Sequence, residues 1–295
     1  MQRVEAQITR LINECDYEEV TRLFEKLSGG KRLRAKLILK IAPTDERAPL
    51  LAAIVELIHG ASLLHDDVID EAMTRRGIAS VNATDGSKTA VMLGDILYSK
   101  AFTELVEFDN QIAKIISSSV TALSKGEMID VKMAETFNAD EDKYLDMLYL
   151  KTATLIEAAA KAAALLVGKD ADKHALYGRN LGLSFQIIDD ILDITSDSET
   201  LGKPTMNDFV EGKCTLPYIY LYNELNETDR EKLISLHAKQ IKNDEILWIK
   251  NQMMKHGCVE KSFELAQKLS KEAQNIVQDD AELVKILETM IKRSY

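Results

Sequence analysis

The sequence Asp-Asp-x-x-Asp occurs twice in this 295-residue chain, at 66–70 and 189–193, each time within an apolar run. The outer aspartates of each copy are four residues apart, so in a helix their Cβ atoms lie roughly 5–6 Å apart on one face. Two unit charges about 6 Å apart repel by roughly 3 kcal/mol at an effective dielectric constant near 20. Partly buried helices that repeat this arrangement need a countercharge, which a divalent metal ion supplies most simply.

Metal binding is the function that the two acidic motifs favour. The alternative is a solvated acidic helix surface, but both copies lie in runs rich in Leu, Ile and Phe. Carboxylate oxygens select a hard cation, Mg²⁺ or Mn²⁺, and Mg²⁺ usually completes its shell with water and substrate phosphate. The motifs therefore predict a phosphorylated partner as well as a metal. The expected ligands are Asp66, Asp67, Asp70, Asp189, Asp190 and Asp193.

Helical periodicity dominates the chain, and the alternation typical of strands is nearly absent. We therefore expect an all-α fold: one helical bundle, a single domain over residues 1–295, with the two acidic helices facing each other in its centre. Two stretches, 74–86 and 195–212, have the Gly, Pro and Asn content of loops. The expected helices include 50–70, 90–107, 111–136, 140–167 and 173–193.

Composition limits the classes of partner and the compartment. The formal charge of −11 argues against nucleic acid and anionic membranes, which require a basic face. Three scattered cysteines without a pairing pattern fit a reducing cytoplasm. The most apolar stretch that we identify, 158–167, is interrupted by Lys161 and too short to span a bilayer. We expect a soluble, cytoplasmic protein without a transmembrane segment.

Several basic residues could meet the phosphate that the acidic motifs imply. Lys31, Arg32 and Arg34 open an expected helix after Gly29-Gly30, where free N–H groups already favour anions. Arg75 and Arg76 follow the first acidic motif, and arginine binds phosphate oxygens in a bidentate manner. Lys203 and Lys213 lie on either side of the second loop. Each basic group alone is more typical of solvated surface; together with two acidic motifs they indicate a phosphate site.

Three further polar residues lie in apolar helical segments. His59 precedes Asp66 by two helical turns, and Lys151 lies in a run where an ammonium group is costly unless it meets an anion. A helical histidine is often a satisfied core residue, but we favour diphosphate contact for both. Gln186 precedes Asp189 by three residues and should project beside the metal centre.

These motifs together resemble the trans-isoprenyl diphosphate synthase (polyprenyl synthetase) family, over nearly the whole chain. Ala35 departs from the pattern, because many relatives carry proline there; we expect it to alter entry into the helix and little else. The resemblance rests on Gly29-Gly30-Lys31-Arg32-Leu33-Arg34, His59, Leu63 to Asp70, Arg75-Arg76-Gly77, Gly94-Asp95, Lys151-Thr152, Phe185 to Asp193, Gly202-Lys203-Pro204 and Gly212-Lys213.

The resemblance implies a helical bundle around a central cavity, usually in a homodimer, in which the six aspartates hold Mg²⁺ on an allylic diphosphate. That substrate would be lined by Arg75, Lys151, Thr152, Gln186, Lys203 and Lys213. Isopentenyl diphosphate would be bound by Lys31, Arg34, His59 and Arg76. Ionisation of the allylic diphosphate, attack by the isopentenyl double bond and proton loss would then join the two. The 195–212 loop would act as a lid that excludes water.

Product length is the least constrained expectation. In this family, bulky aromatic residues four and five positions before the first motif block the growing tail. Here these positions hold Ser62 and Ala61, with Phe102 as a candidate floor. We therefore predict a product longer than C15, in the octaprenyl range, with geranylgeranyl or farnesyl diphosphate as the alternative.

Two other classes of protein are less well supported. A terpene cyclase would not need the basic turn at 29–34 for a second diphosphate, and its second metal motif normally contains Asn and Ser or Thr. A non-catalytic partner subunit would be expected to lose acidic or basic motif residues, and both sets are intact here.

Overall fold

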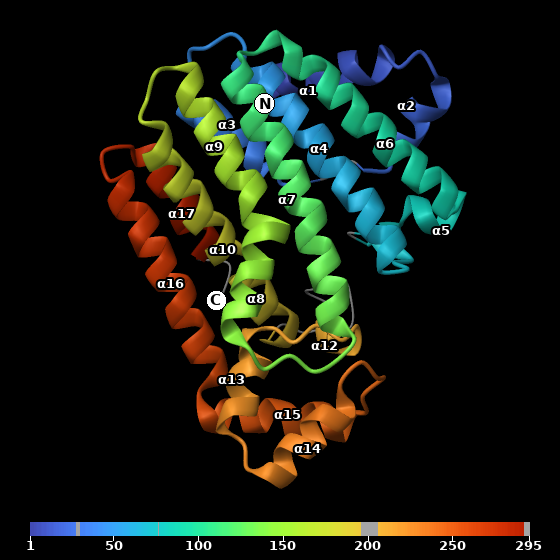
Figure 1. The fold of residues 1–295 in the computed structure, drawn as a ribbon, viewed down its shortest axis with the longest axis vertical. Coiled ribbons are helices and arrows are strands. Elements are labelled where there is room, and N and C mark those ends of the chain that lie inside the picture. Colours follow the sequence, from blue (N-terminus) through green and yellow to red (C-terminus); the bar gives the residue numbers. More distant parts are fainter. Residues whose placement is uncertain (28–29, 76, 196–205, 292–295) are drawn as a thin grey trace. The chain divides into compact units, whose positions relative to one another are not determined.

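A computed structural model describes residues 1–27, 30–75, 77–195 and 206–291, and the expected all-α fold is confirmed (Figure 1). The chain divides into two compact units, Met1–Leu123 with Leu155–Gly178 and Ser124–Thr154 with Arg179–Tyr295. Two long helices, α7 (Asn110–Ala134) and α10 (Ala171–Thr195), contribute residues to both units.

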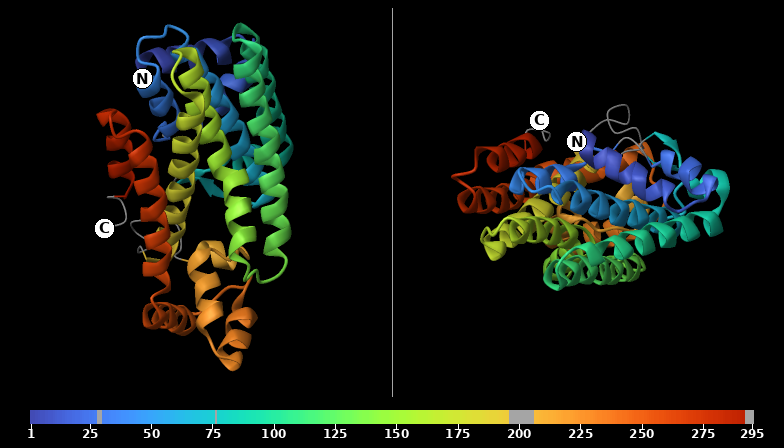
Figure 2. Two further views of the ribbon diagram at one scale, coloured as in Figure 1. Left: turned by 60° about the vertical axis from the view of Figure 1, so that its left-hand side comes forward. Right: turned by 90° about the horizontal axis from the view of Figure 1, so that it is seen from above.

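The first unit is built around α4 (Ala48–Ile69), whose apolar residues cover nearly its whole circumference and are mostly buried. Pro49 lies in its first turn, where a missing N–H costs nothing, and Glu71 just beyond its end has a left-handed φ of 49°. α4 packs along α6 (Ser87–Glu104) (Figures 1 and 2). The other helices are α1 (Gln2–Asn13), α2 (Glu18–Glu25), α3 (Leu33–Ile41), α5 (Val81–Asp85), the 3₁₀ turn η1 (Leu105–Glu107) and most of α9 (Thr154–Leu166).

Among the described residues, α4 is long and apolar enough to cross a membrane, whereas 158–167, identified from the sequence as the most apolar stretch, is too short. Most of it is buried inside the protein, as in the core helix of a soluble protein. Length and composition alone therefore give weak support for a membrane span.

The segment expected as a loop at 74–86 contains regular structure, so that expectation was incomplete. Thr74–Arg75 (β1) pairs antiparallel with Ile78–Ala79 (β2), and Gly77 supplies the positive φ of 78° in the intervening turn. The short helix α5 follows at once. This hairpin is what presents Arg75 beside the end of α4.

The second unit has its own core, formed by α8 (Glu141–Leu148), the end of α10 and the C-terminal helices. Phe209 stacks on Tyr218 with ring centroids 4.3 Å apart. The helix expected over 140–167 is interrupted by a π-helical turn, η2 (Tyr149–Ala153). The remaining helices are α12 (Asn207–Val210), α13 (Leu216–Glu224), α14 (Glu227–Leu236), α15 (Asn243–His256), α16 (Cys258–Ile276) and α17 (Ala281–Ile291).

Candidate active site

The first acidic motif ends α4, and its three aspartates have different surroundings. Asp66 and Asp70 are half-buried, whereas Asp67, one helical step away, is 2% exposed. Arg75 donates from Nε to Asp67 Oδ1 at 2.7 Å, and its Nη2 lies 2.6 Å from the same oxygen. The structure therefore joins a predicted metal ligand to a predicted diphosphate ligand. If Arg75 bound another anion instead, the buried Asp67 carboxylate would need a replacement cation.

His65 fits between α4 and α6 because position 94 is glycine. A Cβ atom on Gly94 would lie 2.3 Å from His65 Nε2. The same nitrogen lies 3.2 Å from the Val91 carbonyl oxygen and 3.5 Å from Asp95 Oδ1, and Tyr98 contacts the ring. The Gly94-Asp95 pair thus accommodates the histidine that precedes the acidic motif, which gives His65 a structural role.

The basic turn before α3 is held by a buried glutamate that our sequence reasoning missed. Glu56 of α4 is 5% exposed, and its Oε2 accepts a hydrogen bond from Arg32 Nη1 at 3.1 Å. Its Oε1 accepts the N–H of Ala35, in the first turn of α3, also at 3.1 Å. Arg32 has an uncommon left-handed φ of 51° and also binds Glu5. Arg32 is thus a structural cation, while Lys31 is exposed and Arg34 half-buried.

Replacing Glu56 by alanine should destabilise the first unit and disorder the basic turn. The change leaves Arg32 without its buried partner and removes the acceptor for the Ala35 amide, so we expect a loss of about 2–3 kcal/mol. Glu5→Gln removes the exposed partner of the same arginine and should cost less than about 1 kcal/mol. Urea denaturation of both variants measures the difference. Equal stabilities would contradict the anchoring role of Glu56.

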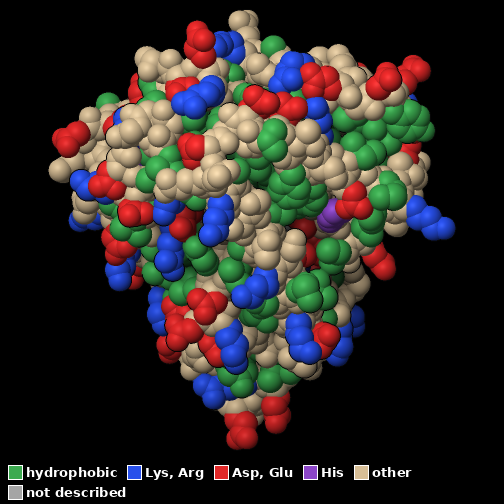
Figure 3. Space-filling view, turned by 45° about the horizontal axis from the view of Figure 1, so that its top comes forward, with side chains coloured by type: hydrophobic (Ala, Val, Ile, Leu, Met, Phe, Trp, Pro, Cys, Tyr) green, Lys and Arg blue, Asp and Glu red, His purple; other side chains and the backbone are tan. Residues whose placement is uncertain are grey.

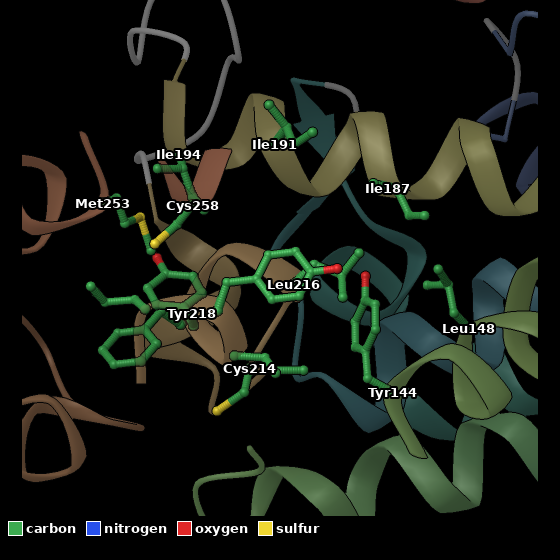
Figure 4. Packing of buried hydrophobic residues seen from close by; sticks show 14 of the residues in the cluster. Tyr144, Leu148, Ile187, Ile191, Ile194, Cys214, Leu216, Tyr218, Met253 and Cys258 are labelled. Carbon is green, nitrogen blue, oxygen red and sulfur yellow. The ribbon is translucent and has the colours of Figure 1, made fainter. Parts of the chain in front are cut away.

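The second acidic motif ends α10 and lies in a hydrogen-bonded network within the second unit. Gln186 donates to Asp190 Oδ1 at 3.0 Å, and Thr152 donates to Gln186 Oε1 at 3.3 Å. Tyr144 of α8, which is fully buried, donates its hydroxyl to Asp190 Oδ2. In Figure 4 the Tyr144 ring points its oxygen toward α10. Three predicted residues are thus brought together, and Tyr144 is an addition that the sequence did not signal.

Negative charge accumulates around Asp190. Burial, Asp208 and Asp189 raise the pKa of the Asp190 carboxyl to about 8, although Tyr144 and Gln186 oppose the shift. Asp193, expected as a metal ligand, accepts the backbone N–H of Asp208 at 3.2 Å and so also shapes the start of α12. The carboxyl groups around Asp190 are close enough that their mutual repulsion favours binding of a cation or a proton.

Lys151 and Thr152 lie on the π-helical turn, a conformation that is rare and often found at functional sites. The turn packs directly on α7, because Gly126 has no side chain: a Cβ there would lie 2.4 Å from the Lys151 backbone nitrogen. Lys151 Nζ lies 2.5 Å from Asp130 Oδ2 and 2.8 Å from Glu127 Oε2. The predicted diphosphate ligand therefore has two acidic neighbours on α7.

Gly126→Ala should displace the π-helical turn, because the added methyl group would collide with backbone and not with a movable side-chain end. We expect a loss of about 1–3 kcal/mol in stability, measured by thermal unfolding. Gly60→Ala is the matched control: a Cβ at Gly60 would make ordinary contacts of 3.6 Å with Leu27 and Leu97. Since alanine has the higher helix propensity, this control should be neutral or stabilising by up to about 1 kcal/mol. A neutral Gly126→Ala would show that the turn can adjust.

The remaining predicted residues have varied positions. Lys213 forms an ion pair with Glu211 at 2.9 Å, and His59 is half-buried on α4. Ala61 is fully buried, but Phe102 is 37% exposed and stacks on Tyr98. The exposure of Phe102 therefore does not support its predicted role as the residue that stops the growing prenyl tail within one copy of the protein. Arg76, Lys203 and most of the expected lid at 195–212 lie outside the described residues.

The residues of each motif fit a hard divalent cation, because every predicted ligand is a carboxylate and Asp190 lies in an excess of negative charge. Within the described parts of the chain, no three His, Cys, Asp or Glu side chains are grouped closely enough to hold a metal ion. Substrate oxygens and water would complete the shell, as is usual for Mg²⁺.

Comparison with known proteins agrees with this geometry. The family model described as polyprenyl synthetase matches residues 17–253. The chain belongs to this family. It is therefore a prenyltransferase of isoprenoid biosynthesis, from a family that uses diphosphate substrates and binds them through divalent metal.

Relatives extend the match over the whole chain. The crystal structure of octaprenyl pyrophosphate synthase from Helicobacter pylori is 44% identical, with a TM-score of 0.94, and the match covers 99% of this chain and 98% of that one. A decaprenyl diphosphate synthase from Rhodobacter capsulatus is 28% identical, with a TM-score of 0.94, covering 100% and 96%. A short chain isoprenyl diphosphate synthase from Methanothermobacter thermautotrophicus is 38% identical over 244 residues, which are 78% of this chain and 75% of that protein.

Proposed function

We propose that this chain condenses isopentenyl diphosphate with an allylic diphosphate, in the presence of Mg²⁺ or Mn²⁺, to give a trans-polyprenyl diphosphate. The observation that carries the proposal is the similarity over nearly the full length to an octaprenyl pyrophosphate synthase, with both acidic motifs intact. The two motifs would act on one allylic diphosphate, and the basic turn anchored by Glu56 would bind the second substrate.

In this mechanism the residues of the chain stabilise the leaving group. Arg75, Lys151 and Lys213 would hold the oxygens of the departing diphosphate and stabilise the charge that develops as the C–O bond breaks. Bound Mg²⁺, held by the six motif aspartates, would supply Lewis-acid neutralisation of that diphosphate. The isopentenyl double bond attacks the allylic cation, and the proton is lost to the released diphosphate.

The proposed product is longer than C15 and octaprenyl-like. Ala61 is small and fully buried on α4, and the same helix continues with the buried residues Ile58, Val55 and Ile54. The positions four and five residues before the first acidic motif thus carry small side chains, Ser62 and Ala61, and no bulky aromatic ring. The named relatives include octaprenyl, decaprenyl and short-chain synthases.

Small diphosphates, and not nucleic acid, are the proposed partners. The net charge is −11, and acidic and basic side chains are interspersed on the face in Figure 3.

We propose a cytoplasmic homodimer. The three cysteines are unpaired thiols, and α6 and η1 expose Val91, Met92, Phe102 and Val106. Apolar side chains gathered along one helix are suited to burial against a second copy.

Product analysis tests the proposed function. The purified chain is incubated with Mg²⁺, isopentenyl diphosphate and a series of allylic primers, and the products are identified by mass spectrometry. Elongated prenyl diphosphates are expected. Release of hydrocarbon would instead indicate a cyclase. A chain that elongates only after addition of another subunit would indicate a partner subunit.

A further inference from the structure

Lys151 forms ion pairs with two acidic residues in the second unit. Its Nζ lies within 2.8 Å of Glu127 and Asp130, which are three residues apart on α7 and so share one face. The lysine side chain is 23% exposed, and the two acids are 11% and 8% exposed. Because the π-helical turn approaches α7 at Gly126, the ammonium group reaches both carboxylates at the same time.

The charges of this site are unequal. Two carboxylates face one ammonium group, and the other oxygen of Glu127 is buried without a hydrogen-bond partner in the described chain. An ammonium group has three N–H donors. Glu127 and Asp130 account for two of them, and the third is left for another acceptor. Burial and Lys213 lower the pKa of Lys151, but Asp130 and Glu127 outweigh them and raise it above its ordinary value.

We propose that Glu127 and Asp130 are positioning residues that keep Lys151 protonated and aim its third N–H at the allylic diphosphate. This proposal rests on the proposed function in one respect, the identification of the bound anion as an allylic diphosphate. Without the two carboxylates, Lys151 would be a desolvated amine next to the cation Lys213, and it would lose its proton more easily. A neutral amine would no longer stabilise the leaving group.

The test uses the double variant Glu127→Gln, Asp130→Asn, which removes both charges and nearly preserves the side-chain shapes. We expect kcat/KM for the allylic substrate to fall by about tenfold or more above neutral pH. A new limb should appear at high pH, where activity decreases as Lys151 deprotonates; the wild-type protein should lack this limb below about pH 10. Asp146→Asn, at an exposed position of α8, removes one charge nearby and should keep the wild-type profile.

A second measurement does not depend on enzymatic activity. Competitive acetylation with acetic anhydride over a pH series, read at Lys151 by mass spectrometry, reports the ionisation of this lysine in the substrate-free protein. The double variant should show the Lys151 labelling curve shifted to lower pH by at least about one unit. If that variant does not fold, the two single variants should each give a smaller shift.

Unchanged labelling curves in folded variants would overturn the proposal. A lowered activity without the high-pH limb would overturn it as well, because that result is expected if the ion pair is merely structural. The two proposals can fail separately. If the wild-type chain makes no prenyl diphosphate, the proposed function is wrong, while the acetylation curves still decide whether Glu127 and Asp130 hold the lysine charged.

Discussion

Asp66→Ala and Asp189→Ala should each strongly reduce Mg²⁺-dependent condensation while leaving the protein helical. Each change removes one carboxylate from the proposed metal-binding set, and the lost stabilisation of the leaving diphosphate should lower kcat/KM by about 10³-fold, or roughly 4 kcal/mol. The rate of isopentenyl incorporation is measured against Mg²⁺ concentration, with circular dichroism as the check on folding.

The control for these variants is Asp172→Ala, because the Asp172 side chain is 90% exposed on α10 and pairs only at the surface with Lys161. It should retain activity within about twofold, since surface ion pairs contribute little. Full activity in Asp66→Ala or in Asp189→Ala would contradict the metal role of that motif.

Ala61→Phe should shift the product distribution to shorter chains by several isoprene units. The side chain at position 61 is fully buried on α4, one turn before the first motif, so an aromatic ring there would fill space that we assign to the growing tail. Mass spectrometry of the products gives the chain length directly. An unchanged distribution in a folded variant would refute the tunnel assignment.

Overpacking is the main complication in this experiment, because a larger side chain in a close-packed core costs about 1–3 kcal/mol. Thermal unfolding therefore accompanies the product analysis. Gly60→Ala, at the neighbouring position, adds bulk that the structure can accommodate and should leave the product length unchanged.

The helices around the site could be predicted from sequence because they are long and rich in apolar residues, without the alternation that strands show. α4, α6 and α10 lie close to the expected ranges. The hairpin at Arg75 and the π-helical turn at Lys151 were missed for two different reasons. A two-residue strand has no measurable alternation, and the π-helical turn depends on a close approach to Gly126 that only the folded chain reveals.

The polar residues of the site were partly predictable. Gln186 was expected beside the metal centre, and it donates a hydrogen bond to Asp190 of the second motif; its place beside a metal stays a prediction. Glu56 gives a usable signal, since it is the one acid within the apolar stretch 48–58 of α4, yet its partner Arg32 is far away in sequence. Tyr144 gave no signal, because a buried tyrosine in a helix looks like any other core residue until its hydroxyl finds Asp190.

The contact between Glu56 and the Ala35 amide also bears on how this sequence can vary. Proline has no N–H, so Ala35→Pro would remove the donor that Glu56 Oε1 now accepts. The effect of a substitution at either position therefore depends on which residue occupies the other, which is epistasis between two sites 21 residues apart. We therefore expect proline at position 35 to be deleterious in this chain, and a compensating change would be sought first at position 56.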